Sequence, residues 1–145
     1  MNPKGPQLAQ LHRLAMFRYR LRRFLRFSER AARASGLTPQ QHQLLLGVAG
    51  FTGRGWATIS ELAEFLQERH NAVVGLVQRA ERKGLVSKSH CHPDQRLVRV
   101  RLTARGDAIL QRLTRVHMAG LASSRLKDPK LARSKSQLIK SLREG

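Results

Sequence analysis

The hydrophobic pattern of the chain changes after Gly84 from a helical period to alternation. Upstream, the apolar residues of the stretch 70–83 recur every three or four positions, which is typical of an amphipathic helix. Downstream, alternation predicts two strands at residues 85–89 and 96–102, with a hairpin loop at 90–95 between them. The sequence therefore predicts a helix that runs directly into a β-hairpin.

Apolar periodicity and capping signals predict further helices. They cover residues 8–35, 38–50, 58–66 and 103–122, and a weaker helix follows Pro129 and runs to Leu142. The clearest start signal is Thr38, Pro39 and Gln41, which supply an N-cap, a first-turn proline and the glutamine of a capping box. Trp56 and Ala57 are expected to form a short extended piece.

The two helices before the hairpin are separated by only a tight turn, as in a helix-turn-helix. A hairpin after the second helix adds a wing, so the predicted fold class is mainly α with a small β-hairpin wing: a winged helix-turn-helix. Such a unit holds DNA in two places, because the second helix fits the major groove and the hairpin tip reaches the flanking minor groove or backbone. Double-stranded DNA is therefore the expected partner.

The segment around the hairpin resembles the MarR family of bacterial transcriptional regulators. Asp94-Gln95-Arg96, five further residues and then Leu102-Thr103-Ala104-Arg105-Gly106 are similar to the wing signature of that family. The run 73–86 is similar to the family's recognition helix leading into the wing. With the long flanking helices included, the resemblance covers roughly residues 8–125.

The resemblance implies an obligate homodimer in which the N- and C-terminal helices of two chains interlock and two wings straddle a pseudo-palindromic operator. It implies that Arg96 at the wing tip enters the minor groove, that Asp94 orients it, and that Arg79 pairs with Asp94. A small-molecule effector that changes the spacing of the two recognition helices would release the DNA. The chain departs from the family at Gln78 and Ala80, where Asp and Leu are common, which affects fine contacts and not the fold.

Three parts follow from this organisation. We expect an N-terminal dimerisation helix at 8–37, a winged helix-turn-helix DNA-binding domain at 38–103, and C-terminal dimerisation helices at 104–145. In the first part, apolar residues at three- and four-residue steps are expected to form a core-facing stripe. The members of this stripe are Leu11, Leu14, Phe17, Leu21, Phe24, Phe27 and Ala31.

The residues expected to touch DNA lie mainly on the exposed side of the recognition helix. Asparagine and glutamine can each form two hydrogen bonds with adenine, whereas arginine reads guanine or binds phosphate. For each of these side chains, a solvated helix surface without a base contact is the alternative. With the two wing residues added, the candidate set is Arg69, His70, Asn71, Gly75, Gln78, Arg82, Asp94 and Arg96.

The charge of the chain favours a polyanionic partner. Its 145 residues include 28 Lys and Arg against 9 Asp and Glu, a formal net charge of +19. Our hypothesis is that Arg20, Arg22 and Arg23 add phosphate contacts and steepen the salt dependence of DNA binding. A nucleoid-type architectural protein with little base preference is the main alternative. An RNA-binding protein is disfavoured, because an aromatic content of 5% offers few stacking platforms.

The sequence offers little for chemistry other than binding. Cys91 is the single cysteine, which excludes an intrachain disulfide and suits a reducing compartment. His90, Cys91 and His92 are metal-type ligands on one loop, but a tight zinc site needs ligands from more than one loop, so no metal site is expected. No catalytic group, no cofactor and no membrane span are expected either. These points predict a non-enzymatic protein of the bacterial cytoplasm, associated with the nucleoid.

Overall fold

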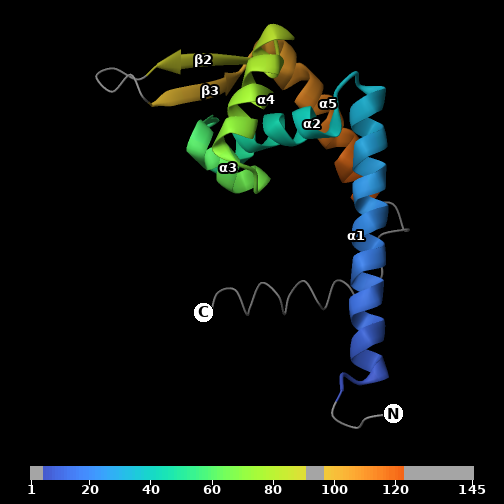
Figure 1. The fold of residues 1–145 in the computed structure, drawn as a ribbon. Helices are drawn as coiled ribbons and strands as arrows, with labels where there is room; N and C mark the ends of the chain where they lie inside the picture. Colours follow the sequence, from blue (N-terminus) through green and yellow to red (C-terminus); the bar gives the residue numbers. More distant parts are fainter. Residues whose placement is uncertain (1–4, 91–96, 123–145) are drawn as a thin grey trace. The chain divides into compact units, whose positions relative to one another are not determined.

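The computed structural model describes residues 5–90 and 97–122, and the chain divides into two compact units. Unit 1 comprises residues 1–27 and 115–145, and unit 2 comprises residues 28–114. Helices α1 (Leu8–Ala34) and α5 (Ala104–Ala122) each contribute residues to both units (Figure 1). The boundaries between the units therefore fall inside these two helices. The domain limits expected from the sequence, at residues 37 and 103, lie instead just after the end of α1 and just before the start of α5.

Unit 2 contains the helix-turn-helix. Its helices are α2 (Pro39–Leu46), the π-helical turn η1 (Gly47–Phe51), α3 (Ile59–Leu66) and α4 (His70–Arg82). The sequence predicts one continuous helix at 38–50, but the hydrogen-bond register changes at Gly47. A Cβ atom at this position would lie 2.5 Å from Cδ1 of Phe65, so the glycine lets the ring pack directly on the backbone. Local widening of a helix into a π turn accommodates such tertiary contacts.

The cap residues expected at the starts of α2 and α3 are confirmed. Thr38 Oγ1 accepts a hydrogen bond from Gln41 N at 3.1 Å, and Gln41 Oε1 accepts one from Thr38 N at 3.0 Å, which completes a capping box. At the start of α3, Thr58 Oγ1 accepts from Glu61 N at 3.2 Å. These caps satisfy N–H groups that a helix leaves without partners in its first turn.

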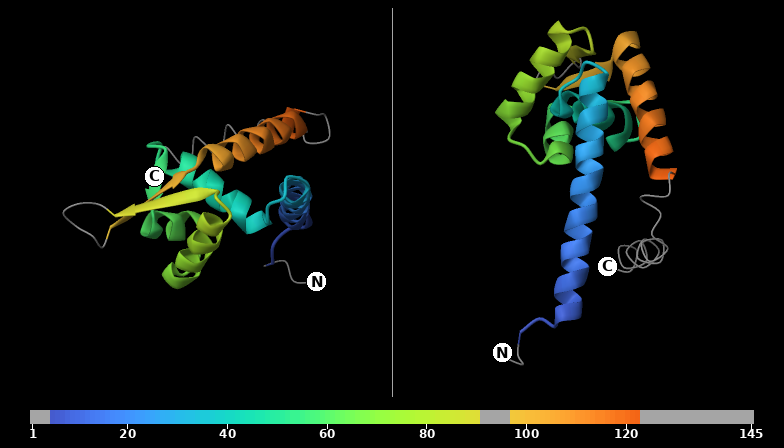
Figure 2. Two further views of the ribbon diagram at one scale, coloured as in Figure 1. Left: turned by 90° about the horizontal axis from the view of Figure 1, so that it is seen from above. Right: turned by 90° about the vertical axis from the view of Figure 1, so that its right-hand side faces the viewer.

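Three strands form one antiparallel sheet in the order β1-β3-β2. Their bounds are Trp56–Thr58 for β1, Val86–His90 for β2 and Val98–Leu102 for β3. The hairpin of β2 and β3 is as predicted, but the expected extended piece at residue 56 becomes a third strand, because it pairs with β3 along its whole length. The hairpin projects from unit 2, with α3 and α4 on one side of it (Figures 1 and 2).

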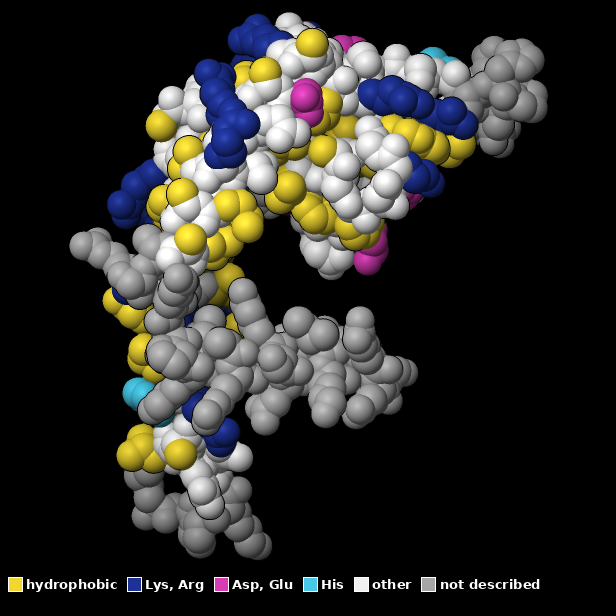
Figure 3. Space-filling model, turned by 180° about the vertical axis from the view of Figure 1, so that it is seen from behind, with side chains coloured by type: hydrophobic (Ala, Val, Ile, Leu, Met, Phe, Trp, Pro, Cys, Tyr) yellow, Lys and Arg dark blue, Asp and Glu magenta, His cyan; other side chains and the backbone are white. Residues whose placement is uncertain are grey.

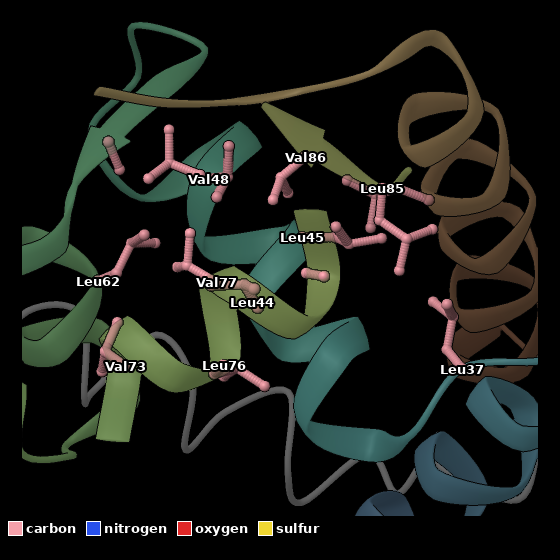
Figure 4. Packing of buried hydrophobic residues seen from close by; sticks show 14 of the residues in the cluster. Leu37, Leu44, Leu45, Val48, Leu62, Val73, Leu76, Val77, Leu85 and Val86 are labelled. Carbon is pink, nitrogen blue, oxygen red and sulfur yellow. The ribbon is translucent and has the colours of Figure 1, made fainter. Parts of the chain in front are cut away.

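The core of unit 2 lies between the helices and one face of this sheet. Leucine and valine side chains from α2, α3, α4 and β2 point toward one another there (Figure 4). On β3, Val100 is fully buried, Val98 and Leu102 pack against the core, and Arg101 is exposed. The alternation read from the sequence is therefore confirmed, and the arginines of β3 lie on the opposite face of the sheet.

A tight corner joins the end of α4, the start of β2 and the start of α5. Thr103 Oγ1 accepts from Gly106 N at 3.0 Å and donates to the Gly84 carbonyl at 2.5 Å, and Thr103 N donates to the Leu85 carbonyl at 3.1 Å. A Cβ atom on Gly106 would overlap the Leu85 carbonyl oxygen. The Leu-Thr-x-x-Gly part of the wing signature therefore fastens α5 to the sheet.

Unit 1 pairs parts of α1 and α5 but leaves much apolar surface open. His117 packs edge-on against the rings of Phe24 and Phe27, with ring centroids 6.2 and 5.5 Å apart. The expectation of a core-facing stripe is wrong within one chain for Leu14 and Phe17, which are 61% and 59% exposed. Two helices alone cannot bury such a stripe. Neither helix is long and apolar enough to cross a membrane, within the described residues.

Candidate nucleic-acid interface

The exposed side of α4 carries a continuous polar stripe. Asn71, Gly75, Gln78 and Arg82 follow one another at helical spacing, so they share one side of the helix. Three of these residues are exposed, and Gly75 is half-buried. The opposite side is buried in the core of unit 2 through the residues Val73, Leu76, Val77 and Ala80. The stripe is therefore held in a fixed orientation by the packing behind it.

The N-terminal end of α4 is open and positively charged. Arg69 is the N-cap residue with extended backbone (φ −70°, ψ 147°), and His70 begins the helix. Both side chains are exposed, and among the described residues no side-chain hydrogen bond from Arg69 caps the first turn of α4. Unpaired N–H groups and the helix dipole make such an end attractive to anions. The sequence-predicted residues Arg69, His70 and Asn71 thus lie together at this end.

A shallow groove runs along one side of the polar stripe. It is lined by Gln40 at the start of α2 and by Asn71, Gly75 and Arg79 on α4, among others. A Cβ atom on Gly75 would lie 3.2 Å from a guanidinium nitrogen of Arg79, so the arginine lies back over the glycine. Sequence reasoning missed Gln40, whose position depends on how α2 packs on α4. The expected pairing of Arg79 with Asp94 involves a residue outside the described ones.

The turn between α3 and α4 is short and conformationally demanding. Gln67 ends α3 in the left-handed region (φ 51°, ψ 45°), and its side-chain Nε2 donates to the Glu64 carbonyl at 2.7 Å. Non-glycine residues adopt this region at a cost, and a local side-chain hydrogen bond compensates part of it. The turn brings α4 back across α3 and so sets the direction of the recognition helix.

A polar network holds the start of α3 to the loop before β1. Arg54 Nη2 donates to both Glu61 carboxylate oxygens, at 2.7 and 2.5 Å, and Thr58 Oγ1 donates to Glu61 Oε1 at 3.1 Å. The hydrogen bond from Arg54 is the main cause that lowers the pKa of Glu61 below its ordinary value of 4.5. Glu61 is therefore an ionised structural partner of Arg54 and Thr58.

The wing is fastened to the recognition helix at its base. Glu81, near the end of α4, accepts a hydrogen bond from Lys88 N at 3.1 Å and pairs with Lys88 Nζ at 3.5 Å. Because Lys88 belongs to β2, movement of the hairpin is coupled to α4. The two wing candidates, Asp94 and Arg96, lie outside the described residues, so their contacts with DNA remain predictions.

The His90-Cys91-His92 segment falls partly outside the described residues too. His90 ends β2, and residues 91 and 92 are not described. Across residues 5–90 and 97–122, no three His, Cys, Asp or Glu side chains gather in a way that could hold a metal ion. Elsewhere in the chain, His42 is buried in unit 2 and His117 packs on phenylalanine rings in unit 1.

Comparison with known proteins supports the interpretation of these features. The model of the MarR family matches residues 35–97. Over 72 residues, half of this chain, the sequence is 33% identical to the HTH-type transcriptional repressor MdtR of Bacillus subtilis (strain 168). The aligned segment spans 44% of that relative.

Solved structures show the same fold. AbsC, a MarR family transcriptional regulator from Streptomyces coelicolor, superposes with a TM-score of 0.79 at 18% identity, covering 97% of this chain and 96% of that chain. A variant of S. aureus MepR bound to an oligodeoxyribonucleotide gives a TM-score of 0.61 at 20% identity, covering 97% of this chain and 99% of that chain. The resemblance read from the wing signature is thus confirmed: residues 35–97 match the model of the MarR family, and the chain shares its fold with solved regulators of that family.

Proposed function

We propose that this chain is a sequence-specific, double-stranded-DNA-binding transcriptional regulator of the MarR type, and that it acts as a repressor. The observation that carries the proposal is the polar stripe of α4, exposed on one side and anchored by a buried face on the other. A helix held in this way presents a fixed row of hydrogen-bonding groups, which suits readout of the major groove. That MdtR is a repressor and that MepR was solved with DNA support repression and duplex binding.

Within this proposal the wing supplies a second contact. Arg96 enters the minor groove, where narrow A·T-rich DNA concentrates negative potential, and Asp94 orients it. The Glu81–Lys88 contact supports this role, because it ties the base of the wing to the recognition helix. Helix and wing then engage adjacent grooves as one body.

We also propose that the regulator is a homodimer. Unit 1 exposes an apolar stripe on α1, formed by Leu11, Leu14, Phe17, Leu21 and Leu25, together with Val116, Met118 and Leu121 on α5. Contiguous apolar surface of this kind marks an interaction site, and a second copy of the chain is the partner that the family resemblance implies. A small-molecule effector that prefers the DNA-free dimer would release the operator.

Selection of bound sequences from random duplex DNA tests the function. A dimeric regulator should enrich a two-fold motif with half-sites about one helical turn apart. Gln78→Ala should weaken binding to the selected site by about 10- to 100-fold, because one base contact is worth about 1–3 kcal/mol, and should leave binding to bulk DNA unchanged. Gln43→Ala, an exposed glutamine on α2, is the matched control. Failure to enrich any motif would refute the proposal.

The alternative is an architectural protein that binds the DNA backbone with little base preference, and the net charge of +19 favours it. Competition by bulk DNA separates the two functions. A specific regulator prefers its site by about 10³- to 10⁷-fold, whereas an architectural protein would lose its labelled duplex to an equal mass of competitor. Replacing Arg20, Arg22 and Arg23 by Ala tests the added phosphate contacts, since an unchanged salt slope would exclude them.

A further inference from the structure

The face of the sheet turned away from the core has an unusual composition. On β3, Arg99 and Arg101 alternate with the buried Val100. The register places Ser89 opposite Arg99 and Ser87 opposite Arg101 on β2, and both serines are exposed. On the other side of β3, the register places Thr58 opposite Arg99 and Trp56 opposite Arg101. We call the set Trp56, Ser87, Ser89, Arg99 and Arg101 the outer sheet face.

Two arginines stack on the indole ring of Trp56, and within residues 5–90 and 97–122 one of them has a carboxylate partner. The guanidinium carbon of Arg54 lies 3.8 Å from the ring centroid and that of Arg99 lies 4.5 Å from it. Arg54 is paired with Glu61. Arg99 Nε, in contrast, is buried and has no hydrogen-bond partner among the described residues. Among the described residues, the stack therefore leaves the charge of Arg99 without a carboxylate partner.

The surroundings of Arg99 fit an anionic oxygen ligand. Arg99 as a whole is half-buried, so its buried Nε is out of reach of a ligand, and the exposed part of the side chain is what an anion can meet. Stacking on Trp56 fixes the plane of the Arg99 guanidinium in advance, which lowers the ordering cost of binding. Figure 3 shows one face of the chain with Lys and Arg side chains in blue and Asp and Glu side chains in magenta.

We propose that the outer sheet face binds phosphate groups of the DNA backbone that flank the half-site, through Arg99 and Arg101. Residues two apart on a strand are about 7 Å apart, so the two guanidinium groups can engage successive phosphates of one strand. Arginine and serine side chains are typical donors to DNA phosphates, and Ser87 and Ser89 lie beside the two arginines. Trp56 acts as a positioning residue for Arg99. This inference rests on the proposed DNA-binding function and extends it beyond α4 and the wing tip.

Salt dependence gives the first test. Binding of the full chain to a random-sequence 40-base-pair duplex is measured over a salt series, and the slope of log affinity against log salt is compared between variants. Each lost phosphate contact should reduce the slope by about 0.9. We expect this reduction once for each subunit of the bound dimer in Arg99→Gln and again in Arg101→Gln, whereas Arg99→Lys keeps the charge and most of the slope. Arg112→Gln, an exposed arginine of α5, is the control and should leave the slope unchanged.

Fluorescence gives the second test, because Trp56 is the single tryptophan of the chain. Duplex DNA should change the Trp56 emission of the wild type and of Arg112→Gln, but not that of Arg99→Gln. Inorganic phosphate at the same phosphate concentration should have little effect; a response to phosphate equal to the response to DNA would overturn the backbone assignment. Normal duplex binding with unchanged slopes in Arg99→Gln and Arg101→Gln would overturn the inference and leave the proposed function intact. Absence of duplex binding by the wild type would instead refute the proposed function, and the inference with it.

Discussion

Gly106→Ala tests whether the corner at Thr103 holds the winged helix unit together. The new methyl group would overlap the Leu85 carbonyl oxygen, which belongs to the backbone and cannot rotate away as a side chain would. To relieve the overlap, α5 must move away from the start of the sheet. That movement lengthens the hydrogen bonds from Thr103 to the Leu85 and Gly84 carbonyls, now 3.1 and 2.5 Å.

The expected loss of stability follows from these contacts. Each of the two hydrogen bonds is worth about 1 kcal/mol net, and steric strain in a packed region costs about 1–3 kcal/mol. The two costs do not add in full, because a movement of α5 that relieves the steric strain is the same movement that lengthens the hydrogen bonds. The helix preference of alanine over glycine returns at most about 1 kcal/mol. A net decrease of about 2 kcal/mol in the free energy of unfolding is therefore expected.

Urea unfolding followed by circular dichroism at one fixed protein concentration measures this change, since a dimer's stability depends on concentration. Gly50→Ala is the matched control: it adds the same methyl group at an exposed glycine with no atom within 4 Å of the new Cβ. The control should stay within about 0.5 kcal/mol of the wild type. A Gly106→Ala protein as stable as this control would refute the structural role assigned to the corner.

Three further predictions concern other parts of the chain. Gln67→Val should destabilise the helix-turn-helix by about 1–2 kcal/mol more than Gln67→Asn, because a β-branched residue tolerates the left-handed φ of 51° poorly; urea unfolding compares them. Glu61→Gln removes the ion pair with Arg54. In the folded protein this partner lowers the pKa of Glu61. The pair stabilises the fold above pH 4.5, and this stabilisation is lost as the pH falls through the lowered pKa of the folded state. The free energy of unfolding of Glu61→Gln should therefore be about 0.2–1 kcal/mol below that of the wild type at pH 7, and the difference should vanish when unfolding is measured at acid pH. Phe17→Glu should halve the molar mass measured by light scattering, whereas Arg23→Glu on the other side of α1 should not; an unchanged mass for Phe17→Glu would remove this helix from the dimer interface.

Local signals account for the parts of the fold that the sequence predicts well. The starts of α2, α3 and α5 depend on Thr38, Thr58 and Thr103, whose caps act within one turn. The π turn at 47–51 escapes such reasoning; the ring of Phe65 packs against Gly47 there, and spacing along one helix cannot show such a contact. The pairing of β1 with β3 escapes it as well, since three residues carry too little pattern to name a partner strand.

In the candidate interface, too, local patterns are predictable from the sequence and contacts between distant segments are not. The stripe of α4 is predictable, because helical spacing alone separates Gln78 and Arg82 from the buried side. Gln40 and the stacking of Arg99 on Trp56 are not, because they depend on contacts between segments distant in sequence. The sequence also overestimates burial on α1, where apolar periodicity indicates that a face will be covered but not by which chain.

The two halves of the wing signature are expected to have different roles, one in the fold and one in DNA binding, and each role needs its own test. Its second half, Thr103 and Gly106, has a structural reason in the corner that attaches α5 to the sheet, and it would be required whatever the unit binds. Its first half, Asp94 and Arg96, lies outside the described residues, and the role proposed for both is contact with DNA. Substitution in the second half should lower stability and, through it, all DNA binding. Substitution of Arg96 should leave the unfolding free energy unchanged and weaken binding to A·T-rich flanks alone. Measuring both properties for both halves distinguishes a motif that specifies the fold from one that reads DNA.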